Sequence, residues 1–160
     1  MLSKIVSGGQ TGADQAALDV AIKLNISHGG WIPKGRLTED GPLPDKYHLQ
    51  EMPTKSYPKR TERNVLDSDG TLIVSHGKLS GGSDLTKKLA QKHGKPCLHL
   101  DMDENAPTYA VRLLTAWITG KGIKTLNVAG SKQSGDPQIY NATVKLLNST
   151  INLKDITTAK

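Results

Sequence analysis

The chain has 160 residues, of which 36% are hydrophobic and 4% aromatic, with no phenylalanine, a net charge of +6 and one cysteine. This length and composition favour a single domain with an aliphatic core, and the lone cysteine excludes an internal disulfide and a multi-cysteine zinc site. The positive charge favours an anionic partner, but acidic residues are dispersed among the basic ones, so nucleic acid is not expected.

No apolar run approaches the ~20 residues that a membrane-spanning helix needs. The N-terminus, MLSKIVSGG, has no apolar core of a signal peptide and leads directly into a segment typical of a strand. We therefore expect a cytoplasmic protein that does not associate with a membrane.

The first part of the chain predicts a strand, a helix and an irregular excursion. Residues 4–7, KIVS, are short and β-branched, as in a buried parallel strand, and from Thr11 apolar residues recur at helical spacing. A second short strand is predicted at 26–32. The proline-rich segment 33–55 is too apolar for disorder, so we expect it to pack on the domain and face a ligand, although a surface insertion explains its length equally well.

Strands and helices alternate in the rest of the chain. Strands are predicted at 70–76, 96–101 and 125–130, and helices at 85–93, 107–119 and 137–148. This alternation predicts a single-domain α/β fold whose mainly parallel sheet is covered on both faces. We expect the domain to occupy residues 1–152 and a C-terminal tail to occupy 153–160.

Three predicted strands end in turns that are rich in glycine and hydroxyl groups and precede helices: SGGQTGAD (7–14), SGGSD (80–84) and GSKQSGD (130–136). In a parallel sheet these turns lie along one edge, where glycine amides and helix N-termini bind anions. The first turn is neither G-x-G-x-x-G nor a P-loop. The predicted ligand-binding residues of the first two turns are Gly8, Gly9, Gln10, Thr11, Gly12, Asp14, Gly81, Gly82 and Ser83.

Carboxylates near these turns have two interpretations. Thr11 and Asp14 have the spacing of a capping box, which would leave Asp14 a structural role. Alternatively, Asp14 or Asp69 would contact the polar ring of a ligand, and these two are also the preferred catalytic candidates if the protein is an enzyme. Asp19 has the spacing of an exposed ion pair with Lys23.

Basic residues surround the excursion and the helix that follows it: Lys34, Arg36, Lys55, Lys59, Arg60 and Arg63. A solvated surface is one explanation, because acidic residues are interspersed among them. If one cation reaches the glycine turns, Arg36 or Arg60 is expected, since a guanidinium offers a planar fork to an oxyanion. Lys34 and Arg36 complete the predicted ligand-binding set.

The histidines lack metal-ligand spacing, so no metal site is predicted from protein side chains. His76 follows a strand and could face the ligand crevice, whereas Cys97 lies in a strand where an inert buried thiol is expected. The helix at 107–119, with Trp117, could form a homodimer interface, although packing on the sheet is the default expectation.

Four stretches resemble the bacterial family named molybdenum carrier proteins: IVSGGQTGADQAALDVA (5–21), GGWIPKGRLTEDGPLP (29–44), RTERNVLDSDGTLIVS (60–75) and GGSDLT (81–86). The resemblance covers roughly residues 4–148. It implies a three-layer, doubly wound Rossmann-like domain of the superfamily shared with LOG-type proteins and DNA-processing protein A. It also implies an anionic ligand at the glycine turns, either molybdenum cofactor (molybdopterin) or another nucleotide- or pterin-type phosphate.

The sequence departs from the LOG-type enzymes, which cleave nucleoside monophosphates and carry P-G-G-x-G-T-x-x-E. The matching stretch keeps Gly81 and Gly82, but Ser80 replaces the proline and Lys88 the glutamate. The resemblance therefore implies a molybdenum cofactor carrier rather than an enzyme, with a nucleoside monophosphate N-glycosidase as the alternative. Single-stranded nucleic-acid binding is a third hypothesis, which the scarcity of aromatic residues disfavours.

Overall fold

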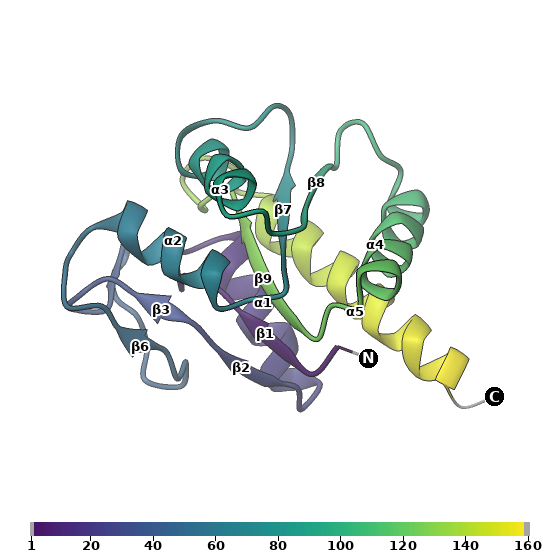
Figure 1. Ribbon diagram of the computed structural model, residues 1–160, viewed down its shortest axis with the longest axis horizontal. Coiled ribbons are helices and arrows are strands. Elements are labelled where there is room, and N and C mark those ends of the chain that lie inside the picture. Colours follow the sequence, from purple (N-terminus) through teal and green to yellow (C-terminus); the bar gives the residue numbers. More distant parts are fainter. Residues whose placement is uncertain (1, 159–160) are drawn as a thin grey trace.

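The centre of the protein is a parallel sheet of five strands: β1 (Lys4–Val6), β2 (Ser27–Gly29), β7 (Gly70–Ser75), β8 (Cys97–Asp101) and β9 (Thr125–Gly130). The computed structural model describes residues 2–158, with side chains as far as residue 152. The strand order is β2-β1-β9-β7-β8, and every pair is parallel (Figure 1). The predicted α/β fold with a mainly parallel sheet is confirmed.

Helices cover both faces of this sheet. They are α1 (Ala13–Lys23), α2 (Tyr57–Leu66), α3 (Gly81–Lys92), α4 (Pro107–Lys121) and α5 (Ile139–Thr158). The helices α1, α4 and α5 pack together on one face, and α2 packs with α3 on the other (Figure 1). The three-layer, doubly wound Rossmann-like architecture is therefore confirmed.

The strand order reverses between β7 and β9. The chain passes from β7 outward to β8, whereas β9 lies on the other side of β7. Because α3 follows β7 on one face and α5 follows β9 on the other, the two connections diverge at the carboxyl ends of these strands. A doubly wound sheet opens a ligand crevice at this place.

The core is aliphatic, as the composition predicted. On β7, Leu72 and Val74 belong to a buried cluster with Leu114 of α4 and Leu147 of α5, while Ile73 is buried outside that cluster. This alternation follows from the two-residue period of a strand, which places neighbouring side chains on opposite faces. Burial of each such side chain stabilises the fold by about 1.5–3 kcal/mol.

The excursion after β2 is ordered by short strands and a core of its own. The strand β3 (Trp31–Ile32) pairs in parallel with β6 (Gln50–Glu51), and β4 (Leu37–Thr38) pairs in antiparallel with β5 (Gly41–Pro42). A second buried cluster attaches the excursion to α1; its members are Leu18, Ile32, Leu43, Tyr47 and Leu49. The excursion is therefore packed, as predicted.

Some predicted boundaries differ from the structure. The strand predicted at 26–32 is divided at Gly30, whose φ of +127° favours glycine and where a Cβ would lie 2.1 Å from the carbonyl oxygen of Ser7. The helix predicted from residue 85 begins at Gly81, and the helix predicted at 137–148 begins at Ile139. The division into a domain (1–152) and a tail (153–160) stays a prediction, although the backbone is helical as far as Thr158.

Within residues 2–158, no helix has the length and apolar composition needed to cross a membrane.

Candidate functional site

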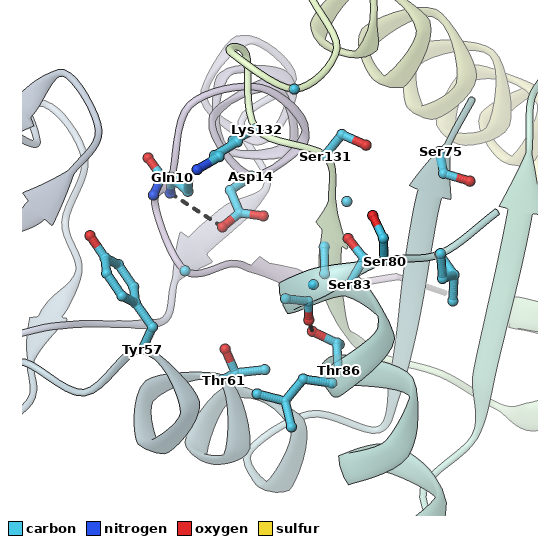
Figure 2. A pocket seen from close by; sticks show the side chains of 18 of the residues that line it. Gln10, Asp14, Tyr57, Thr61, Ser75, Ser80, Ser83, Thr86, Ser131 and Lys132 are labelled. Atoms are coloured by element: carbon cyan, nitrogen blue, oxygen red, sulfur yellow. Dashed lines mark hydrogen bonds between the residues drawn. The ribbon is translucent and has the colours of Figure 1, made fainter. Parts of the chain in front are cut away.

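A cavity of about 660 Å³ opens at the carboxyl ends of β7 and β9, where the strand order reverses (Figure 2). Its lining comes from the first turn, from α2, from the start of α3 and from the turn after β9. The three predicted glycine turns therefore do meet at one edge of the sheet. They do not offer the same chemistry to a ligand.

The first turn is filled by a carboxylate of the protein itself. The backbone N–H of Gln10 donates to Oδ2 of Asp14 at 3.2 Å, and the N–H of Thr11 donates to the side-chain oxygen of Gln10 at 3.1 Å. The N–H of Ala13 donates to the carbonyl of Ser131 at 3.1 Å. The carboxylate of Asp14 therefore occupies the place of an anion at the amides of Gln10 and Gly8.

The glycines of the first turn are required by neighbouring protein atoms. A Cβ on Gly8 would lie 2.2 Å from the guanidinium of Arg60, and a Cβ on Gly12 would lie 2.4 Å from the carbonyl oxygen of Ser131. A Cβ on Gly9 would lie 3.0 Å from Ile32. Close packing of the chain on itself therefore accounts for this bare backbone without a ligand.

The capping box predicted for Thr11 and Asp14 is not formed as expected. The N-cap of α1 is Gly12, with no side-chain cap. The hydroxyl of Thr11 donates to Oε1 of Glu39 and accepts the N–H of Gln133 at 3.0 Å. Thr11 therefore joins the turns instead of capping the helix.

The third turn is also filled by a carboxylate of the protein. Glu39, on the excursion, accepts the backbone N–H of Ser134 at 3.0 Å and the hydroxyl of Ser134 at 2.5 Å. The hydrogen bonds from the Ser134 and Thr11 side chains lower the pKa of Glu39, which stays exposed to solvent. Glu39 thus links the excursion to two of the glycine turns.

The second turn is open. A Cβ on Gly81 or Gly82 would meet no atom within 4 Å, and within residues 2–158 neither backbone N–H has a hydrogen-bond acceptor. Both residues lie in the first turn of α3, whose dipole places a partial positive charge at this end. Ser80, the N-cap residue, does not use its hydroxyl as a cap, and Lys78 lines the same cavity. This turn is the one suited to an external anion.

Asp14 lies opposite this helix start and is almost completely buried, with 8% of its surface exposed. Burial raises the pKa of its carboxyl from 3.8 to about 6, against the opposing effects of Arg60 and of the amides of Gln10 and Gly8. In Figure 2 the carboxyl group points into the cavity, towards Ser80 and Ser83. An acid with this pKa exists in both protonation states near neutral pH.

Arg60 of α2 is the arginine that reaches the glycine turns. Its Nη1 atom donates to the carbonyl of Gly8 at 2.5 Å, and its guanidinium carbon lies 5.3 Å from the ring centroid of Tyr57. Burial lowers the pKa of Arg60, while the charge of Asp14 opposes this change. No ion pair closer than 4.0 Å joins the two in the described chain, so Asp14 is compensated from a distance.

The other predicted cations do not line the cavity. Arg36 donates to the carbonyls of Leu43, Pro44 and Tyr47, and so holds the excursion in shape. Lys34 is exposed and lies outside the lining. The sequence alone could not show which of the basic residues contacts the glycine turns.

Asp69 lies at the opposite edge of the sheet from the cavity. Its Oδ2 accepts the backbone N–H groups of Lys124 at 3.0 Å and Thr125 at 2.8 Å, at the amino ends of β7 and β9. The bond from Thr125 is the largest cause that lowers the pKa of Asp69. The structure does not bring Asp69 to the other predicted site residues.

Several residues of the cavity were not singled out by the sequence. Tyr57, which is 41% exposed, Glu39, Lys78 and Lys132 all line it. Lys132 lies within the predicted third turn, so the sequence could have identified it as a cavity residue. Tyr57 and Glu39 reach the cavity only because α2 and the excursion fold over the sheet edge.

Asp19 does not form the predicted exposed pair with Lys23. Its carboxylate accepts the hydroxyls of Tyr47, at 2.6 Å, and Tyr140, which ties the excursion and α5 to α1. Burial, the hydrogen bond to Asp19 and the charge of Asp19 raise the pKa of Tyr140 to about 12. Trp117 packs against the main core, in agreement with the expectation that its helix packs on the sheet.

A second cavity, of about 800 Å³, lies between α4 and α5. His76 lines it, with Nδ1 2.5 Å from Oδ2 of Asp136, so this histidine does not face the first cavity. None of the predicted ligand-binding residues lines this second cavity, which is why we place the candidate site in the first. In the described part of the chain, no group of three His, Cys, Asp or Glu side chains is arranged to hold a metal ion.

Comparison with known proteins places this geometry in a family. Residues 5–151 match the model of the "Circularly permutated YpsA SLOG family". A crystal structure described as "Putative molybdenum carrier protein", from Syntrophus aciditrophicus SB, is 56% identical, covers 93% of this chain and 94% of that chain, and superposes with a TM-score of 0.92. No curated protein matches the chain. Numbered from β7 as though the chain began there, the sheet order is 2-1-3-4-5, a common doubly wound order.

Proposed function

Because the chain belongs to the circularly permutated YpsA family of SLOG proteins, we propose that it binds a small ligand with a phosphate-like end in the cavity between β7 and β9. The ligand is of the nucleotide or pterin type. The protein holds this ligand as a carrier and does not convert it. We expect it to do so in the cytoplasm, without nucleic acid, as a monomer or a homodimer.

The observation that carries this proposal is the open start of α3. The N–H groups of Gly81 and Gly82 face the cavity without an acceptor among residues 2–158, whereas carboxylates of the protein fill the other two turns. Unpaired amides at a helix N-terminus bind phosphate well, and Lys78 adds a positive charge. The hydroxyls of Ser80 and Ser83 line the same end of the cavity.

The similar protein described as a molybdenum carrier supports a molybdenum-containing form of this ligand. The donors of the cavity suit the phosphate of a pterin cofactor, which Gly81, Gly82 and Lys78 would hold. The described side chains offer no group of three metal ligands, so the metal would be held through its organic part. Bound molybdenum cofactor would supply an oxo-metal centre, while this chain would bind and cover it.

The ligand is identified by anaerobic purification of the native protein, denaturation, mass spectrometry of the released molecules and metal analysis. A pterin phosphate with near-stoichiometric molybdenum supports the carrier function. A nucleotide without metal supports the cavity but contradicts the molybdenum form. Protein that releases neither, and binds no phosphate compound on titration, contradicts the proposal.

A lysine pair tests where the phosphate lies. Lys78→Ala removes a charge from the cavity lining, and we expect it to weaken binding of the released ligand about tenfold. Lys34→Ala removes an exposed lysine that lies outside the lining and should leave affinity unchanged. Equal affinities for the two variants would place the phosphate elsewhere.

Nucleotide hydrolysis is the second candidate, and Asp14 is the observation that favours it. A buried carboxyl with a pKa of about 6 inside a cavity suits general acid–base chemistry. The position of the LOG-type glutamate, however, holds Lys88, which pairs with Asp84 at 2.9 Å on α3. Incubation with nucleoside monophosphates decides the point: released base that disappears in Asp14→Asn establishes an enzyme, and intact nucleotide supports a carrier.

A further inference from the structure

The carboxyl group of Asp14 is only partly paired by the protein. Its Oδ2 accepts the N–H of Gln10 at 3.2 Å, and the backbone N–H of Gly8 also stabilises the charged form, but no side chain among residues 2–152 donates to this carboxyl group. Asp14 lines the cavity, and in Figure 2 the oxygen that is not bonded to Gln10, Oδ1, points into it. A carboxylate that is 8% exposed therefore keeps one oxygen for a donor that comes from outside the protein.

This free oxygen calls for a donor because a buried, incompletely paired carboxylate is costly. The role of Asp14 in the first turn uses backbone amides and does not explain why Oδ1 faces the cavity. Arg60 compensates the charge from α2, but its Nη1 donates a hydrogen bond to the carbonyl of Gly8 and not to Asp14. The missing partner is thus a ligand group that carries N–H or O–H donors.

Other charged groups of the cavity do not compete for this role. Glu39 also lines it, but its two oxygens accept bonds from Thr11 and Ser134. Lys78, Lys132 and Arg60 are donors themselves. Among the described residues of the lining, Asp14 is therefore the carboxylate available to a ligand.

The exposed ring of Tyr57 indicates what kind of ligand group the cavity binds. Tyr57 lines the cavity with 41% of its surface exposed, although its ring could have been buried. Aromatic rings exposed in a cavity stack on planar heterocycles, as they do on bases in nucleic-acid complexes. Because Tyr57 lines the same cavity as Asp14, a ligand with a planar ring is favoured over one that offers Asp14 only a sugar hydroxyl.

We propose that Asp14 selects the ring of the ligand, and that this ring presents two adjacent N–H donors, as the ring N–H and the neighbouring 2-amino group of guanine and of pterins do. Each carboxylate oxygen accepts more than one hydrogen bond, so Oδ1 accepts one N–H of such an edge, and Oδ2, which also accepts the N–H of Gln10, accepts the other. The pairing edge of adenine offers one donor and one acceptor, so its ring nitrogen would face a carboxylate oxygen without a proton between them. This inference rests on the proposed function, which supplies the phosphate end at Gly81 and Gly82.

Three nucleotides with the same ribose phosphate test the selection by calorimetric titration at pH 8. Guanosine monophosphate offers two donors, inosine monophosphate one donor, and adenosine monophosphate a donor beside an acceptor. We expect the guanine nucleotide to bind about 10- to 100-fold more tightly than the adenine nucleotide, with the inosine nucleotide between them. Equal affinities overturn this inference but leave the proposed function intact, whereas no binding of any of the three overturns this inference and the nucleotide form of the proposed function.

The pH dependence provides a test that needs no variant. Asp14 accepts two donors only when ionised, so the preference for guanine should fall as the pH is lowered from 8 to 5. Protonated Asp14 donates to the ring nitrogen of adenine, which improves binding of the adenine nucleotide. The ionisation of the phosphate is common to both nucleotides and cancels in the ratio of their affinities. A ratio that does not change with pH contradicts the role of Asp14.

The variant Asp14→Asn distinguishes selection from a structural role. Asparagine keeps an acceptor for Gln10 but presents one donor and one acceptor to the ring, which matches adenine. We expect the preference to be reversed, so that adenosine monophosphate binds more tightly than guanosine monophosphate. A structural role alone would weaken all three nucleotides by the same factor, and this result would overturn the inference.

Discussion

Nη1 of Arg60 donates a hydrogen bond to the carbonyl oxygen of Gly8 across 2.5 Å, which joins helix α2 to the first glycine turn. The bond places a buried guanidinium near Asp14 and fills the space that a side chain on Gly8 would need. One contact between residues 52 positions apart therefore explains both the missing side chain at position 8 and the positive charge near Asp14.

We expect Arg60→Met to lower the free energy of unfolding by about 2–4 kcal/mol, because it removes a charge-assisted bond and leaves the buried carbonyl of Gly8 unpaired. Urea denaturation measures this loss. Arg63→Met on the same helix is the matched control, since its side chain is 52% exposed and its partner Asp67 is exposed as well. That control should change stability by less than about 1 kcal/mol. Similar losses for both variants would contradict the importance of the Gly8 contact.

Asp14→Asn should stabilise the protein at neutral pH. The pKa of Asp14 is raised in the folded state from 3.8 to about 6, so the folded state binds the proton more tightly. Asp14 therefore reduces stability as the pH rises through this interval, by up to about 3 kcal/mol above pH 6. Denaturation of both proteins at pH 4, 5, 6 and 8 should show an advantage of the variant that grows up to pH 6 and is then constant. An advantage that does not vary with pH would contradict the raised pKa.

Gly12→Ala should destabilise the fold by about 2 kcal/mol or more. The added Cβ would lie 2.4 Å from the backbone carbonyl of Ser131, and the φ of +82° is strained for alanine. The thermal unfolding temperature measures the effect. Gly120→Ala is a suitable control, because a Cβ there meets no atom within 4 Å. A Gly12→Ala protein as stable as the control would show that the turn moves freely.

Gly82→Ala should separate ligand binding from stability. Its Cβ meets no protein atom, so the free energy of unfolding should change by less than about 1 kcal/mol. The same methyl group stands where the proposed phosphate approaches the amides of α3, and affinity for the released ligand should fall about tenfold or more. Affinity equal to that of the wild type would remove the α3 start from the site.

Glu39→Ala should release the excursion from the third turn. We expect faster hydrogen exchange at the amide of Ser134, which donates to Glu39, while the global stability changes little. The folded-state pKa of Glu39 is lowered, so its bonds stabilise the fold above its ordinary value of 4.5 and are lost as the pH falls through the lowered value. Exchange in the wild type should therefore approach that of the variant only in acid. Asp40→Ala, at the exposed neighbouring position, is the control.

The alternation of strands and helices could be predicted because it depends on local patterns. The run of Leu72, Ile73 and Val74 and the helical spacing of Ala13 and Ala17 depend on neighbours a few residues apart. The meeting of the three turns could also be predicted from the parallel sheet, since the carboxyl ends of parallel strands lie at one edge. The start of α3 was misplaced because glycines usually indicate a loop, although Gly81 and Gly82 can occupy a first helical turn.

The sequence by itself determined an aliphatic, parallel α/β domain with glycine turns gathered at one sheet edge, because hydrophobic period and turn chemistry are local properties. Only the tertiary structure decided which turn is open. Glu39 binds Ser134 from 95 positions away, and Arg60 rather than Arg36 reaches Gly8. Such pairings depend on how the excursion and α2 fold over the edge, and hydrogen bonds between distant residues leave no period in the sequence. The same packing leaves Gly81, Gly82 and one oxygen of Asp14 facing the cavity.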